Sequence, residues 1–227
     1  FRFVGEECRN VMENVAVQDM SAFAKMEVSG PGARNWLDSI LANRIPKKMG
    51  RIALCHLLTA RGGVRSEFTV YEWAPGRFYL VSAGAYERHD HDTLAKLLPA
   101  DGSVKLNAIT TRLGVLVLAG PQARKVLQKL TTADLSNEAF PWLSGQAIPV
   151  GHASCHVLRV NFVGELGYEL YVPQEFGAHV YDTLWAAGAT HGIANAGYRA
   201  IDSCRMEKGY LYWSGDISPD YNPYEAG

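Results

Sequence analysis

Apolar and polar positions follow a strand-then-helix pattern in the stretch AKMEVSGPGARNWLDSIL (residues 24–41). Its first residues alternate apolar with polar, Lys25 and Glu27 being the polar ones, which predicts a strand. From residue 33 the apolar positions fall three and four apart, which predicts a helix with one apolar face. Pro31 stands between the two elements, and we expect it at the first helical position, where its missing N–H costs nothing.

The pattern returns in GVLVLAGPQARKVLQKLT (residues 114–131), where Gly120 and Pro121 repeat Gly30 and Pro31. The strand of this second copy is wholly apolar over residues 115–118, so we expect it to be more deeply buried. Two copies of one strand–turn–helix unit indicate two related α+β halves, at about residues 1–108 and 109–227.

Further elements follow from the same reasoning. A hairpin is expected over 67–73 and 77–82, strands over 154–162 and 166–172, and helices near 85–98, 175–187 and 197–208. No Gly/Ser-rich linker separates the halves, so we predict an α+β fold of two packed subdomains.

The composition and net charge of the chain argue against some classes of binding partner. The chain has 227 residues, 48% hydrophobic, and a formal net charge of −1, so nucleic acid and anionic membranes are not expected as partners. Its four cysteines lie far apart, which indicates reduced thiols, and no apolar run approaches the length of a membrane span. Because the chain begins without Met and stops after a turn at residues 222–227, we expect a segment of a longer protein.

The segment GELGYELY (residues 164–171) is a candidate ligand site. On an extended chain Glu165, Gly167 and Glu169 share one face, and Tyr168 lies on the other. Glycine permits close approach, and a carboxylate can accept two N–H bonds from a flat heterocycle. The alternative is a solvated strand face with a bulge.

Other candidates are weighed in the same way. RGGVRSE (residues 61–67) delivers Glu67 into a cleft, or is a turn with an exposed acid. The His and Asp residues of 86–92 are expected to be helix-surface chemistry, with Asp90 as a structural cap, because His89 and His91 point to different sides of a helix.

Two Cys-His pairs, an Asp-Arg pair and an aromatic stretch are further candidate features. The adjacent pairs Cys55-His56 and Cys155-His156 should split across strand faces, so a zinc site is not expected. Asp202 and Arg205 are spaced to pair on a helix surface. The aromatic stretch 209–216 is either a core edge or a wall for a flat ligand, and no glycine-rich nucleotide loop or nucleophile elbow is present in the sequence.

A resemblance joins these motifs. The chain resembles the folate-binding aminomethyltransferase family, which includes the T-protein of the glycine cleavage system. Its likeness is closest to the folate-binding portion of dimethylglycine and sarcosine dehydrogenases. The segments that carry the resemblance are 19–21, 25–31, Asn43, 45–47, 61–63, 120–124, 134–140, 164–173, 202–210 and 222–227.

The resemblance implies a cloverleaf whose first two subdomains enclose a tetrahydrofolate cavity. A third, β-barrel domain would follow Gly227. In the dehydrogenase branch an FAD-binding domain would precede Phe1, so FAD is expected only outside this chain or in a separate subunit. No metal is implied.

The resemblance also assigns residues. Glu169 falls on the family's pteridine-binding Glu, Glu165 on the first Glu of the same motif, and Glu67 on the catalytic Asp position. Tyr168 and Trp213 are expected to wall the ring.

This sequence departs from the family pattern at four places. Glu replaces Asp at position 67, and Ile201 stands where the T-protein has its folate-binding Arg. Phe162 replaces a Tyr, and Val163 replaces a Thr.

The expected function is tetrahydrofolate-dependent one-carbon transfer, as aminomethyl or methylene, from a small methylated amine or another methyl donor. A flavin dehydrogenase domain or subunit is the expected partner, in bacterial cytoplasm or mitochondrial matrix. Two alternatives stay open: a folate-dependent O- or S-demethylase, and a non-catalytic regulatory relative such as a subunit that regulates a phosphatase.

Overall fold

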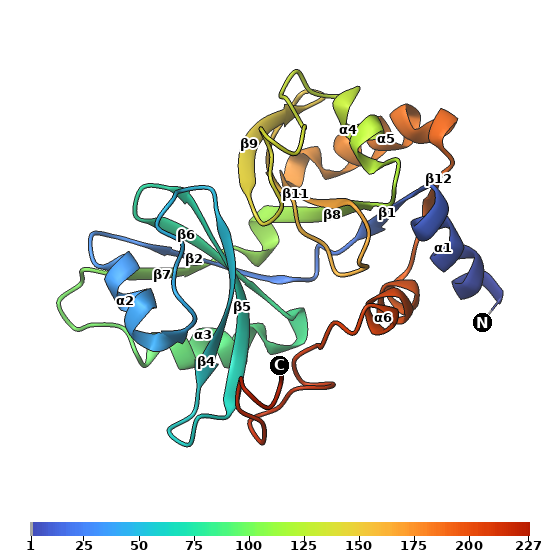
Figure 1. Cartoon of the computed structure of the whole chain (residues 1–227). Coiled ribbons are helices and arrows are strands. Elements are labelled where there is room, and N and C mark those ends of the chain that lie inside the picture. The colour runs from blue at the N-terminus through green and yellow to red at the C-terminus, as the bar shows by residue number, and fades with distance from the viewer. Residues whose placement is uncertain (1) are drawn as a thin grey trace. The chain divides into compact units, whose positions relative to one another are not determined.

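The computed structural model describes residues 2–227, which form two compact units (Figure 1). The first unit comprises residues 2–21 and 111–210, and the second comprises residues 22–110 and 211–227. Each contains one six-stranded sheet with helices, which confirms the predicted α+β class. The units differ from the expected halves at 1–108 and 109–227 because each takes in one end of the chain.

The first unit has the strand order β12-β1-β8-β11-β10-β9. Its strands are β1 (Val15–Asp19), β8 (Leu113–Ala119), β9 (Gly145–Val150), β10 (Ala153–Leu158), β11 (Gly167–Pro173) and β12 (Ile193–Asn195). Its helices are α1 (Arg2–Glu13), α4 (Ala123–Gln128), α5 (Gly177–Gly188) and α6 (Tyr198–Glu207).

The second unit has the strand order β3-β4-β5-β6-β2-β7. Its strands are β2 (Ala24–Ser29), β3 (Leu41–Ala42), β4 (Ile52–Leu58), β5 (Val64–Ala74), β6 (Arg77–Ser82) and β7 (Lys105–Ala108). Its helices are α2 (Ala33–Ile40) and α3 (Glu87–Ala95).

Each sheet has one face packed into a helix-covered core. In the first unit, apolar residues of β8, β10 and β11 pack with Val126 and Leu127 of α4 and Leu184 of α5. In the second, residues of β2, β4, β5 and β6 pack with Trp36 of α2 and Leu94 of α3. Because side chains alternate along a strand, the remaining positions of each strand project to the opposite face, where Glu169 of β11 and Glu67 of β5 lie.

The two Gly-Pro turns have the same backbone connections in both units. Gly30 donates its N–H to Gly76 at the β5–β6 turn, and Gly120 donates to Leu166, which leads into β11. Both glycines have positive φ, 122° and 131°, a region that L side chains rarely adopt. A Cβ on Gly120 would lie 2.5 Å from the Asn14 carbonyl oxygen, so the turn requires glycine for space as well as conformation.

The arginine that follows each turn ties its helix to a strand of the sheet. Arg34 pairs with Glu72 of β5, and Arg124 donates to the Tyr168 hydroxyl of β11 at 3.2 Å. The two copies of the sequence repeat thus also share a contact between the arginine of the helix and a strand of the sheet.

Several predicted details differ in the structure. Pro31 is not the first helical residue, since Gly32 is the N-cap of α2. The strand expected over 154–162 ends at Leu158, and the helix expected near 85–98 begins at Glu87 after a short 3-10 turn. Lys25 and Glu27 are buried although they are the polar members of β2, because Lys25 donates to the Phe23 carbonyl and Glu27 binds Arg77.

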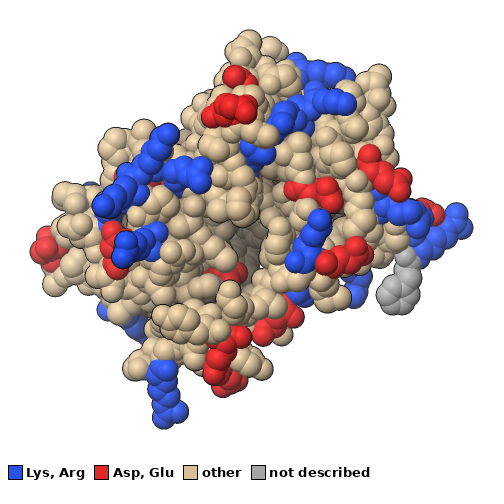
Figure 2. Space-filling view, viewed as in Figure 1, with Lys and Arg blue, Asp and Glu red and all other residues tan. Residues whose placement is uncertain are grey.

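The charged side chains on the surface are mixed in sign, as the net charge of −1 leads one to expect. On the face shown in Figure 2, acidic and basic side chains are interspersed. Among residues 2–227 there is no helix of the length and apolar character needed to cross a bilayer.

The glycine requirement gives a stability prediction. Gly120→Ala should lower the free energy of unfolding by about 3 kcal/mol, because it combines a disfavoured positive φ with overlap against backbone. Gly209→Ala is the matched control, since Gly209 also has positive φ (72°) but has open space around its Cβ position. It should lose only about 1 kcal/mol. Urea unfolding of both variants measures the difference, and equal losses would contradict the steric argument.

Candidate functional site

Glu169 lies on the face of the first unit's sheet that is opposite the helix-covered core. Its neighbours Tyr168 and Leu170 point into that core, as the alternation along β11 requires. The Tyr171 hydroxyl, two residues along on the same face, donates to Glu169 Oε2 at 2.8 Å. Within residues 2–227 this carboxylate accepts no other hydrogen bond, so its second oxygen is available to a ligand.

Burial raises the pKa of Glu169 to about 7, and the hydrogen bond from Tyr171 only partly opposes this. The pKa of Tyr171 is also raised, by burial and then by the adjacent carboxylate. A carboxyl whose pKa is moved this far toward neutrality by burial is a candidate functional group. Paired N–H donors from a ligand would stabilise its ionised form.

Tyr168 and Glu165 do not share this face. Tyr168 is fully buried in the core, where its ring packs against Phe140 with centroids 5.8 Å apart. Glu165 precedes β11, which starts at Gly167, and its carboxylate lies 3.7 Å from Lys208 Nζ. The predicted pairing of Glu165 and Glu169 on one strand face is therefore wrong: only Gly167 and Glu169 belong to the strand.

Glu67 lies near the start of β5, on the face of the second unit's sheet opposite its core. Its cross-strand neighbour on β4 is His56, and His56 Nε2 lies 2.9 Å from Glu67 Oε2. The two side chains are 18% and 20% exposed, so the pair is shielded but accessible. The sequence did not identify His56 as a partner of Glu67, because the pairing register of β4 and β5 was not predicted.

The Cys-His pairs divide across their strands as expected. Cys55 lies in the core and His56 on the opposite face, and Cys155 and His156 divide in the same way. Burial lowers the pKa of His156, which favours its neutral form.

Trp213 belongs to a small cluster of its own unit. Its indole Nε1 donates to the Val64 carbonyl at 3.0 Å, and the Tyr86 ring meets it edge-on with centroids 4.6 Å apart. The side chain is buried with Val64 and Ile217, so its contacts here are those of a core edge.

The segment 86–92 has a structural role. Asp90 is buried and accepts hydrogen bonds from Ser66 and Ser82, each at 2.7 Å. Burial raises its pKa, and the two hydroxyls oppose that rise. Asp90 thus ties α3 to strands β5 and β6 and does not cap the helix, and no group of three metal-ligating side chains occurs in the described part of the chain.

The structure also places the residues at which the sequence departs from the family pattern. Ile201 is buried on α6, and Phe162 stacks on Tyr210 with centroids 5.9 Å apart. Arg205, one turn after Ile201, was expected on the surface but is only 6% exposed. It binds Asp202 and donates to the Tyr210 carbonyl at 3.0 Å, so its charge is already engaged.

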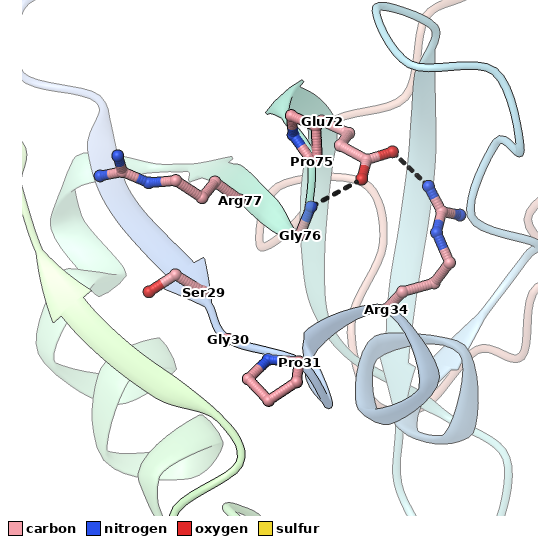
Figure 3. Close-up of a pocket in the computed structure, with 8 residues that line it drawn as sticks. All are labelled: Ser29, Gly30, Pro31, Arg34, Glu72, Pro75, Gly76 and Arg77. Carbon is pink, nitrogen blue, oxygen red and sulfur yellow. Dashed lines mark hydrogen bonds and ion pairs between the residues drawn. The ribbon is translucent and has the colours of Figure 1, made fainter.

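A cavity of about 460 Å³ lies beside the first Gly-Pro turn, within the second unit (Figure 3). Its two cations are each paired with an acid, Arg34 with Glu72 and Arg77 with Glu27. Glu72 also accepts the Gly76 N–H at 3.1 Å. These contacts fix the turn and leave no charge uncompensated, so the cavity is a weaker candidate than the faces that carry Glu169 and Glu67.

Comparisons with known proteins agree with this architecture. The family model described as the GCVT N-terminal domain matches residues 1–227. Dimethylglycine dehydrogenase, mitochondrial, of Homo sapiens is 40% identical over 228 residues, covering 100% of this chain and 26% of the relative. Sarcosine dehydrogenase, mitochondrial, of Mus musculus is 39% identical over 241 residues, covering 99% of this chain and 26% of the relative.

A solved structure shares the fold. Glycine cleavage system aminomethyltransferase T from Bartonella henselae matches with a TM-score of 0.83 at 26% identity, covering 97% of this chain and 58% of that chain. The chain spans about a quarter of the length of the two dehydrogenases. The resemblance drawn from the motifs is confirmed, and the chain belongs to the GCVT N-terminal domain family.

Proposed function

We propose that this chain is a tetrahydrofolate-dependent one-carbon transfer module of a dimethylglycine- or sarcosine-dehydrogenase-like enzyme. The observation that carries the proposal is Glu169: a half-buried carboxylate with one engaged oxygen and a pKa of about 7, at the family's pteridine-binding position. Residues of this kind fit the group, because a pteridine presents neighbouring N–H donors that a carboxylate can accept together.

Glu169 would orient the ring. Tyr171 fixes Oε2 of the carboxylate, so the remaining acceptor direction is set before a ligand arrives. Tetrahydrofolate supplies the nucleophilic nitrogen that accepts the carbon unit. Within this chain Glu67 would position that amine or take its proton, in the manner of a general base.

His56 would assist Glu67. Its Nε2–H, when donated to Glu67 Oε2, holds the carboxylate in one rotamer and leaves Oε1 for the amine proton. Glu is one methylene longer than the Asp usual at this position, and the hydrogen bond to His56 compensates by restricting the longer side chain. Glu67 and His56 are adjacent on paired strands, which fixes the geometry between them.

The wider assignments rest on the relatives. We propose that the carbon donor is a small methylated amine, that a flavin domain or subunit oxidises it, and that the protein works in the mitochondrial matrix or bacterial cytoplasm. Product analysis separates the enzyme alternatives: methylene-tetrahydrofolate supports this proposal, whereas 5-methyl-tetrahydrofolate indicates a demethylase. A chain that binds no tetrahydrofolate, and instead binds a protein partner, would favour a regulatory relative.

Tetrahydrofolate binding should depend on pH through Glu169. Below a pKa of about 7 the carboxyl is protonated and loses an acceptor site, so Kd should rise by about tenfold per pH unit, and above 7 it should level off. Calorimetric titration from pH 5.5 to 8.5 measures this. Glu169→Gln should bind weakly with a flat profile, and the exposed Glu175→Gln is the matched control with wild-type behaviour. A flat wild-type profile would contradict the assignment.

Glu67→Gln should separate chemistry from binding. Loss of the base is expected to lower folate-dependent turnover of the whole protein by about 10²- to 10⁴-fold, while the Kd for tetrahydrofolate stays within about threefold. Asp92→Asn, on the exposed side of α3, is the control. Unchanged turnover in Glu67→Gln would remove Glu67 from the reaction, and single-turnover formation of methylene-tetrahydrofolate is the measurement.

A further inference from the structure

Gln18 is a buried residue of the first unit whose amide nitrogen has no hydrogen-bond partner among residues 2–227. It lies on β1 and is only 2% exposed, and within residues 2–227 its Nε2 meets no acceptor. Burying an amide N–H without a partner is costly, and buried polar groups in native proteins are nearly always satisfied by protein, water or ligand. The other residues of this strand interior, 15–17, are apolar.

The register of three strands places Gln18 on the same face as Glu169. Gln18 of β1 pairs with Val117 of β8, and Val117 pairs with Glu169 of β11. Directly paired residues of neighbouring strands project to the same side of a sheet. With strands ~4.8 Å apart, the Cα atoms of Gln18 and Glu169 are separated by about 10 Å, and the buried Val117 lies between them.

The separation of about 10 Å is comparable to the width of a flat ring with a hydrogen bond on each side. Gln18 and Val117 are 2% and 3% exposed, so such a ring has to displace the atoms that cover them. A bicyclic heterocycle lying over the apolar Val117 would have the Glu169 carboxylate at one side and the Gln18 amide at the other. A carboxylate recognises N–H groups, and an amide N–H recognises a carbonyl. The pair therefore matches a ring that carries N–H donors and an adjacent oxo group on neighbouring atoms.

We propose that Gln18 is a specificity-determining residue that donates its Nε2–H to the oxo group of the heterocycle held by Glu169. This inference rests on the proposed function, in which that heterocycle is the pteridine of tetrahydrofolate. Its 2-amino and N3–H groups face Glu169, and its 4-oxo group accepts from Gln18. A ring with a 4-amino group in place of the 4-oxo group would present a donor to the Gln18 N–H, which is also a donor, so this hydrogen bond could not form.

The test compares two ligands in three proteins. Kd values for tetrahydrofolate and for its 4-amino-4-deoxy analogue are measured with the wild type, Gln18→Leu and Gln18→Glu. Using the ratio of the two Kd values cancels changes common to both ligands. An amide can rotate to present its oxygen, so Gln18→Glu, which offers only acceptors, is the decisive variant.

Gln18→Leu should weaken tetrahydrofolate binding by about 3- to 10-fold, the worth of one neutral hydrogen bond, and change the analogue by less. Gln18→Glu should shift the ratio toward the analogue by about tenfold or more, because its carboxylate accepts from the 4-amino group and repels the 4-oxo group. Gln174→Leu, an exposed glutamine of the same unit, is the matched control and should leave both Kd values unchanged.

The stability of the Gln18→Leu variant shows whether Gln18 serves ligand recognition or the folded structure. Since the amide nitrogen has no partner in the described part of the unliganded chain, Gln18→Leu should be at least as resistant to urea as the wild type. Equal weakening of both ligands by Gln18→Leu and Gln18→Glu, or no weakening of either, overturns this inference alone if the wild type binds tetrahydrofolate and Glu169→Gln does not. Absence of wild-type binding overturns the proposed function and this inference with it.

Discussion

The alternation of side chains along a strand is the constraint that places both candidate carboxylates, Glu67 and Glu169. Each sheet has one face filled by apolar residues beneath its helices, so every second residue of a strand is committed to the core. The residues between them are held by the same backbone hydrogen bonds and project to the opposite face. Glu67 and Glu169 occupy such positions, which is why a carboxylate can be placed accurately without disturbing the core.

Much of the fold could be predicted from the period of apolar residues. The repeated strand–turn–helix units, the hairpin of β5 and β6, and helices α3, α5 and α6 lie close to where the pattern put them. Helix α1 and strands β1, β3, β7, β9 and β12 were not predicted; β3, β7 and β12 have two to four residues, too few to show a period. The exchange of chain ends between units depends on pairing of β1 with β8, a contact distant in sequence that no local pattern reports.

The sequence pointed to individual candidate residues of the site but not to the side chains that contact them. The resemblance pointed to Glu169 and Glu67, whereas the hydrogen bond from Tyr171 comes from the structure, and His56 and Gln18 are placed by strand register. Register also explains the two weaker assignments. Tyr168 is one residue from Glu169 and so faces the core, and Glu165 precedes the strand that would have aligned it. Sequence motifs record which residues are present, and pairing decides which of them meet.

The exchange of chain ends has a consequence for synthesis on the ribosome. Strand β1 is made before residues 22–110, yet its partners β8 and β12 emerge only after them. The second unit in turn receives its Trp213 and Tyr221 contacts from the last residues of the chain. The sheet of the first unit cannot form until β8 and β12 have been made, so the nascent chain exposes an unpaired β1 edge that invites non-native pairing. Removal of residues 2–21 would leave β8 and β12 without the strand that lies between them in the first unit's sheet.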